Sequence, residues 1–172
     1  NIYFHYSKDN SITIKDDGRG IPVDFHPKYK NKRAFEIVLN TLHAGGKFTD
    51  SAYKTSGGLH GVGISVVNAL SEKLEIKIYK NSKQYSQTYF RGKTKSKVKI
   101  EKCKKNLRGT EICFIPDNEI FESINFSPKK LYNFIKMKAV LVKGTKIYFS
   151  IDKVLIFKLY SLLQFKDGIF SL

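Results

Sequence analysis

The chain has 172 residues, of which 41% are hydrophobic and 13% aromatic, and this composition excludes an intrinsically disordered protein. Its 31 basic and 15 acidic residues give a net charge of +16, which suits a phosphate-rich partner such as DNA, although the lysine-rich usage of an AT-rich genome gives the same balance. Two cysteines exclude a disulfide framework or a cysteine metal set, and with no recognisable signal peptide we expect a reducing, cytoplasmic location.

The first half of the chain is expected to hold one hairpin and two helices. Residues 2–6 and 11–15 alternate apolar and polar side chains on either side of SKDN, which is the pattern of a β-hairpin. The loop DDGRGIP follows at 16–22. Apolar residues at helical spacing in RAFEIVLNTLHA predict a helix there, and a second helix is expected from about 61 to 70.

The second half is expected to be mostly strands. Alternating patterns predict strands at 74–80, 84–90, 97–102, 110–116 and 145–151. A helix across 127–141 has Ser127 as its N-cap and Pro128 as its first residue. The apolar stretch 154–163 is too short to span a membrane and reads as a core strand or helix. Helices early and strands late predict an α+β fold with helices on one face of a sheet.

The segment TSGGLHGVGISVVNAL (55–70) places four glycines at the start of a helix: Gly57, Gly58, Gly61 and Gly63. Glycine inside an element costs roughly 0.5–1 kcal/mol relative to alanine, so we expect something, most simply an anion, to approach this backbone closely. The segment lacks the Gly-Lys-Ser/Thr of a P-loop, and it follows the long lid-like loop 43–60 rather than a strand. A flexible loop with a close helix–helix contact is the alternative.

The loop DDGRGIP offers a second candidate site. Asp16 follows a strand, and Gly18 and Gly20 leave the neighbouring backbone open. A carboxylate in such a pocket accepts a hydrogen bond from an exocyclic amine such as that of adenine. A plain Asp-Gly turn is the alternative. The combination of this turn with the glycine-rich helix start, separated by one helix and a lid-like loop, favours a nucleotide site.

DDGRGIP, LHAGGKF and SGGLHGVGISVVNALS, in this order, resemble the ATPase domain of the B subunits of bacterial type II topoisomerases. These belong to the GHKL superfamily with Hsp-type chaperones, histidine kinases and MutL. The segment IPVDFHPKYKNK is more similar to topoisomerase IV than to gyrase, and RGTEICFIPDNEIF continues the similarity to about residue 150. The resemblance implies a two-layer α/β sandwich of the Bergerat type, with a mixed, mostly antiparallel sheet and helices on one face.

The resemblance assigns the base-binding end of an ATP site. Asp16 would bind the adenine amino group, helped by a water and by Thr110. The base pocket would further be lined by Arg19 at the rim, Gly20, Ile21, Pro22, Val38 and, from the lid, Tyr53. Thr110 has the simpler alternative of being an ordinary strand residue.

The resemblance also assigns the phosphate end. Lys47 and Lys54, in the lid, would approach the phosphates. Backbone N–H groups would cradle them at Leu59, His60, Gly61, Val62 and Gly63. The two lysines have the alternative of being ordinary solvated charges, and His60 that of a structural residue at the start of a helix.

No catalytic residue and no metal ligand are assigned. In the family, the glutamate that activates water and the asparagine that ligates Mg²⁺ lie on a helix upstream of the first hairpin. A lysine for the γ-phosphate comes from a downstream transducer domain. Because the chain begins at Asn1 and lacks these motifs, residues 1–172 are expected to be a single, incomplete GHKL domain that is impaired in hydrolysis.

The expected function is the ATP-binding part of an ATP-dependent type II DNA topoisomerase, in which ATP-driven clamp closure accompanies strand passage. The implied cofactors are ATP and Mg²⁺. The implied partners are DNA, the A subunit and a second ATPase domain, with no membrane. A non-catalytic relic, a basic DNA-binding fragment or another GHKL ATPase such as MutL is the alternative. The basic run 93–105 is read as a charged edge strand that discourages aggregation, with DNA contact as its alternative.

Overall fold

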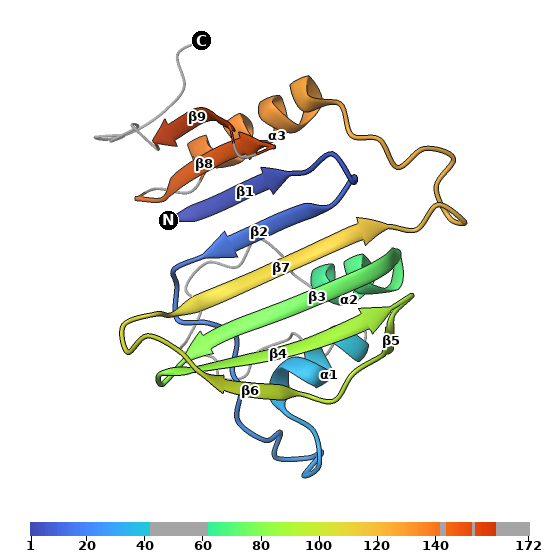
Figure 1. Cartoon of the computed structure of the whole chain (residues 1–172), viewed down its shortest axis with the longest axis vertical. Coiled ribbons are helices and arrows are strands. Elements are labelled where there is room, and N and C mark those ends of the chain that lie inside the picture. The colour runs from blue at the N-terminus through green and yellow to red at the C-terminus, as the bar shows by residue number, and fades with distance from the viewer. Residues whose placement is uncertain (42–61, 142–143, 153, 161–172) are drawn as a thin grey trace.

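A computed structural model of the chain describes residues 1–41, 62–141, 144–152 and 154–160. In this part, nine strands form one mixed sheet in the order β5-β4-β3-β7-β2-β1-β8-β9, with β6 also paired to β4 (Figure 1). The strands are β1 (Ile2–Tyr6), β2 (Ile12–Asp16), β3 (Ser71–Lys80), β4 (Lys83–Phe90), β5 (Lys93–Thr94), β6 (Lys99–Lys102), β7 (Gly109–Pro116), β8 (Lys146–Ile151) and β9 (Val154–Tyr160). Strand β8 runs parallel to β1, and the other pairs are antiparallel.

Three helices, α1 (Ala34–Asn40), α2 (Gly63–Ala69) and α3 (Pro128–Leu141), lie on one face of this sheet (Figure 1). The strand register shows that the helices cover the same face of the sheet, because directly paired residues point to the same side of it. One such row crosses five strands through Phe149, Phe4, Ile14, Ile112 and Ile76. Its two ends pack under different helices, which confirms the predicted α+β sandwich with helices on one face.

The core is divided into two clusters beneath these helices. Phe35 and Leu39 of α1 are fully buried against Leu74 and Ile76 of β3. The second cluster lies under α3, where apolar residues of this helix at helical spacing pack against β1 and β8. This second cluster consists of Ile135, Ala139, Ile147 and Phe149, with Ile2, Phe4, Leu131, Tyr132 and Ile151 packed around it.

Buried polar groups fix α1 against the sheet. The Tyr89 hydroxyl donates to Gln87 Oε1 at 2.5 Å, and Gln87 Nε2 donates to Glu36 Oε1 at 3.2 Å. The other oxygen of Glu36 accepts from the Arg33 backbone N–H at 2.8 Å and so caps the helix. Burial, helped by the nearby Glu36 carboxylate, raises the pKa of Tyr89, so this phenol stays a neutral donor. The start of α1 therefore has a defined position over β4.

The element boundaries differ from the sequence prediction in several places. Helix α1 ends at Asn40 and Thr41 is extended, so the predicted helix, whose apolar face included Thr41, was too long at this end within the described residues. Strand β5 was not predicted, because two residues are too few for a visible alternation. The stretch 154–160 is a strand, one of the two predicted possibilities. No helix in the described part of the chain is long and apolar enough to cross a membrane.

Candidate functional site

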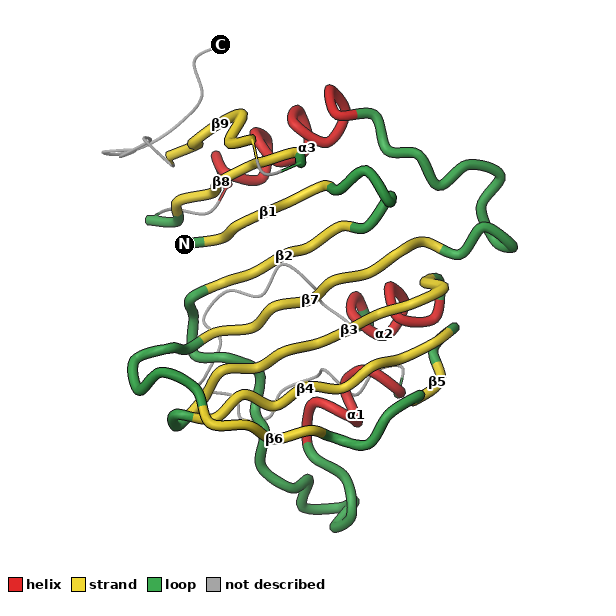
Figure 2. Tube along the Cα trace, viewed as in Figure 1, coloured by secondary structure: helices red, strands yellow, loops and turns green. Residues whose placement is uncertain are grey.

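Asp16 is the last residue of β2 and starts the loop that leads to α1 (Figure 2). Its Oδ1 atom accepts a hydrogen bond from the Gly18 backbone N–H at 2.8 Å, which closes a short turn. A Cβ atom on Gly18 would lie 2.7 Å from this same oxygen, so the turn favours glycine. Asp16 is directly paired with Ile2, which packs in the cluster under α3. The carboxylate therefore lies on the helix-covered face of the sheet.

Gly20 and Gly109 allow three backbone segments to meet beside Asp16. Gly109, the first residue of β7, has a φ of +116°, and a Cβ there would lie 1.9 Å from the Asp16 carbonyl oxygen. Gly20 has a φ of +72°, and a Cβ there would lie 3.2 Å from the Gly109 carbonyl oxygen. The overlap excludes a side chain at Gly109, and the positive φ of Gly20 disfavours one there. Gly109 was missed by sequence reasoning, although its place immediately before a predicted strand was visible.

Thr110 fastens the loop to the sheet. Its side chain is buried, and its Oγ1 atom accepts a hydrogen bond from the Ile21 backbone N–H at 3.1 Å. Ile21 and Val23 then pack into the cluster beneath α1. Thr110 is therefore more than an ordinary strand residue, because it joins β7 to the loop that begins at Asp16. Among the described residues its hydroxyl has no acceptor of its own, so it can donate a second hydrogen bond.

The remaining predicted wall residues lie in the loop after Asp16 and in α1. Ile21 and Pro22 are half-buried, and Val38 of α1 is buried. Arg33, the residue before α1, holds this loop by donating a hydrogen bond from its Nη1 atom to the Val23 carbonyl at 2.7 Å. Arg19 is exposed. The structure thus brings Asp16, Gly20, Ile21 and Thr110 together through explicit contacts.

The phosphate end is described only where α2 begins. Val62 precedes the helix, and its carbonyl accepts from the Val66 N–H and the Ser65 hydroxyl at 3.0 and 2.9 Å. Gly63 is exposed, and a Cβ there would meet no described atom within 4 Å. A close helix–helix contact within the described part of the chain therefore does not explain this glycine. The other predicted residues of the lid and phosphate end lie outside the described residues: Lys47, Tyr53, Lys54, Leu59, His60 and Gly61.

A metal ion held by protein side chains alone requires several His, Cys, Asp or Glu side chains close together. They contain no group of three or more His, Cys, Asp or Glu side chains that could hold a metal ion. A Mg²⁺ ion that arrives with a nucleotide is held mostly by phosphates and waters, so this result concerns only a metal site built from protein side chains alone.

Comparisons with known proteins agree with the motifs. Residues 2–118 match the model of the histidine kinase-, DNA gyrase B-, and HSP90-like ATPase family. Over 141 residues the chain is 55% identical to the B subunit of DNA topoisomerase 4 from Rickettsia bellii, covering 81% of this chain and 21% of that protein. The B subunit of DNA gyrase from Thermotoga maritima is 47% identical over 143 residues, which cover 83% of this chain and 22% of that protein. The chain thus spans about a fifth of the length of these relatives.

A solved structure extends the similarity to the fold. The topoisomerase IV ATP-binding domain of Francisella tularensis, in complex with a small-molecule inhibitor, superposes with a TM-score of 0.72 at 36% identity. The match covers 87% of this chain and 69% of that chain. The resemblance to type II topoisomerase ATPase domains, closer to topoisomerase IV than to gyrase, is confirmed. The chain belongs to the histidine kinase-, DNA gyrase B-, and HSP90-like ATPase family.

Proposed function

We propose that this chain binds ATP as the nucleotide-binding part of an ATP-dependent type II DNA topoisomerase. The observation that carries the proposal is the Asp16 carboxylate, which ends β2 on the helix-covered face inside a junction that glycines keep free of side chains. The family membership supports the same nucleotide. ATP binding would drive closure of a clamp around DNA, together with an A subunit and a second ATPase domain, in the bacterial cytoplasm.

At the base end, one carboxylate oxygen of Asp16 stabilises the turn and the other would bind the nucleotide. Oδ1 holds the Gly18 N–H, and Oδ2 is the atom that we propose accepts from the adenine amino group. The Thr110 hydroxyl accepts from Ile21 and would donate its proton to a water shared with the base. The apolar walls of the pocket would be Ile21, Pro22 and Val38, with Arg19 at the rim and Tyr53 reaching in from the lid.

At the phosphate end, backbone N–H groups from Leu59 to Gly63 would face the triphosphate, with Lys47 and Lys54 supplying positive charge. The open surroundings of Gly63 support this role, because no described side chain explains its lack of a Cβ. ATP is expected to arrive as its Mg²⁺ complex. We assign no Mg²⁺ ligand, no general base and no hydrolysis step, because no motif of this sequence places an acidic or amide side chain at the phosphates.

Purine selectivity tests the proposal at the base end. ATP carries an amine at position 6, which donates to a carboxylate, whereas GTP carries a carbonyl oxygen that an ionised Asp16 would repel. Equilibrium binding by titration calorimetry should therefore favour ATP over GTP by about tenfold or more, the equivalent of roughly 1.4 kcal/mol. Equal affinity for the two nucleotides, or no binding at millimolar ATP, would overturn the assignment of Asp16 as the base-reading group.

Substituting Gly63 tests the phosphate end separately. Gly63→Ala is expected to leave folding unchanged or to stabilise α2 by up to about 1 kcal/mol, since alanine is the better helix former and its methyl group would meet no atom of the described residues within 4 Å. The same methyl group would obstruct the approach of phosphate oxygens, so we expect ATP affinity to fall by about tenfold, or roughly 1.4 kcal/mol. Thermal unfolding and calorimetry on the same samples separate the two effects. Unchanged ATP affinity would remove Gly63 from the site.

A further inference from the structure

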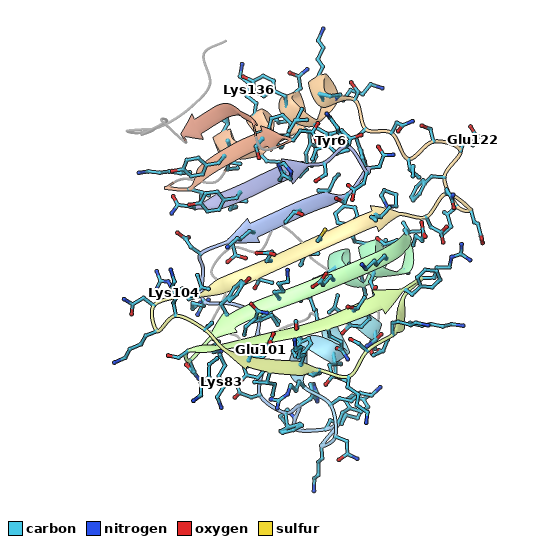
Figure 3. The ribbon with its side chains drawn as sticks, viewed as in Figure 1. Tyr6, Lys83, Glu101, Lys104, Glu122 and Lys136 are labelled. Atoms are coloured by element: carbon cyan, nitrogen blue, oxygen red, sulfur yellow. The ribbon has the colours of Figure 1, made fainter. Side chains whose placement is uncertain are left out.

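Six basic residues gather where β3, β4, β6 and β7 meet at one end of the sheet. This turn-end basic cluster consists of Lys80, Lys83, Lys102, Lys104, Lys105 and Arg108. Figure 3 labels Lys83 and Lys104 at this end. All six are exposed except the half-buried Lys80, and within the described part of the chain none of them forms an ion pair.

The backbone holds these residues in a fixed arrangement. Lys80 and Lys83 close the β3–β4 hairpin through Asn81 and Ser82, both in the left-handed region with φ of 53° and 58°. The Ser82 carbonyl accepts from the Cys103 N–H at 3.0 Å, which ties this hairpin to the end of β6. The backbone positions of the cluster residues are therefore fixed relative to one another.

The strand register places like charges directly opposite one another. Lys83 pairs with Lys80 on one side and with Lys102 on the other. Like charges in directly opposite positions destabilise a sheet, so this row of three lysines lowers the stability of the isolated chain. A polyanion bound across the three lysines would offset the repulsion between them.

The acidic groups next to the cluster do not neutralise it. Glu101 is paired with Lys99 at 2.9 Å. Asp17 contributes its backbone carbonyl, which accepts from Arg108 Nε at 3.1 Å. The row of three lysines is therefore left as a concentrated positive charge.

A hollow next to the lysine row has the polar chemistry of a phosphate contact. It has a volume of about 560 Å³ and is lined by Asn81, Lys105, Asn106, Leu107 and Arg108. Two amides and two cations provide hydrogen-bond donors suited to phosphate oxygens. Leu107 is the one apolar residue lining it, and it is half-buried, so the surface lacks the apolar anchors that a lipid membrane would require.

We propose that the turn-end basic cluster binds the phosphate backbone of duplex DNA. This inference rests on the proposed function and deepens it, because it names where the DNA partner contacts the chain. The contacts are to phosphates and carry no base sequence. Arg108 bonds to Asp17, the neighbour of Asp16, and so connects the DNA surface with the nucleotide end of the sheet.

The test compares two triple variants of equal charge. One is Lys83→Gln, Lys104→Gln and Lys105→Gln in the cluster. The matched control is Lys129→Gln, Lys130→Gln and Lys136→Gln on α3, which packs near the opposite edge of the sheet, where Figure 3 labels Lys136. Both lower the formal net charge from +16 to +13. All six side chains are exposed, so both variants should fold, which circular dichroism checks.

Fluorescence anisotropy with a duplex of mixed sequence measures DNA affinity across a salt series. Six phosphate contacts give a slope of log K against log[salt] of about −5, and the cluster variant should lower its magnitude to about 3. We expect its affinity to fall on the order of tenfold at moderate salt, while the control variant keeps the original slope. Equal losses in both variants, or no loss in either, would overturn the proposal. ATP affinity of the cluster variant, measured separately, should stay within about twofold, so failure of the nucleotide site is distinguishable from failure of the DNA surface.

Discussion

Replacing Asp16 with asparagine is expected to weaken ATP binding by roughly 10- to 100-fold, because a hydrogen bond to an ionised group contributes about 1.5–3 kcal/mol. Asparagine keeps an oxygen that can accept from the Gly18 N–H, so the turn at the end of β2 should survive. Its amide nitrogen, however, would face the adenine amine with a donor instead of an acceptor. The same amide can donate to the carbonyl of guanine, so the preference for ATP over GTP should also relax.

Asp24→Asn is the matched control for this substitution. Asp24 is exposed and lies in the same β2–α1 connection, where its backbone carbonyl accepts from the Ala34 N–H at 2.9 Å. The control removes the same charge without touching the proposed base pocket, and titration calorimetry should find its ATP affinity unchanged. If both variants bind ATP as the wild-type chain does, Asp16 is only a turn residue.

Gly109→Ala is expected to be the most destabilising single substitution in the glycine junction. The residue combines a φ of +116° with a position where a Cβ would lie 1.9 Å from the Asp16 carbonyl oxygen, so the backbone of β2 or β7 must move. Such a combination of backbone strain and steric conflict costs about 2–4 kcal/mol. In a chain of this size, that lowers the thermal midpoint by roughly 5–15 °C.

Gly144→Ala separates the two causes of that loss. Gly144 also has a positive φ, +79°, but a Cβ there would meet no described atom within 4 Å. It should therefore lose only the cost of the left-handed conformation, about 1–2 kcal/mol. Urea unfolding of both variants gives the comparison. A loss for Gly109→Ala no larger than that for Gly144→Ala would mean that the close approach to Asp16 is unimportant for stability.

Much of the fold was predictable because alternation and helical spacing are local. The alternation at 11–15 and 74–80 indicates strands directly, and these appear in the sheet as β2, which is shifted by one residue to Ile12–Asp16, and as part of β3. The pairing between strands was not predictable, because the parallel contact of Ile2 with Ile147 depends on the whole chain between them. The apolar alternation of each strand fixes which side is covered, but it does not identify the neighbouring strand.

Two candidate site residues could be chosen from the sequence because they stand in one recognisable loop, and their role in binding ATP stays a prediction. Asp16 and Gly20 were identified from the loop in which they stand, and the structure places both in the junction. Gly109 was not identified, because the reason for its lack of a side chain is the carbonyl of a residue distant in sequence. The hydrogen bond from the Ile21 N–H to Thr110 could not be predicted either, because its partners are distant in sequence and every residue type other than proline has a backbone N–H.

A structure of the chain with a non-hydrolysable ATP analogue tests the central claim most directly. We expect one carboxylate oxygen of Asp16 to lie about 3 Å from the adenine amino nitrogen, and the phosphate oxygens to contact backbone N–H groups between Gly61 and Gly63. A nucleotide that contacts only one of these two segments, or a base held elsewhere with Asp16 turned away from it, would contradict the claim that both belong to a single ATP site.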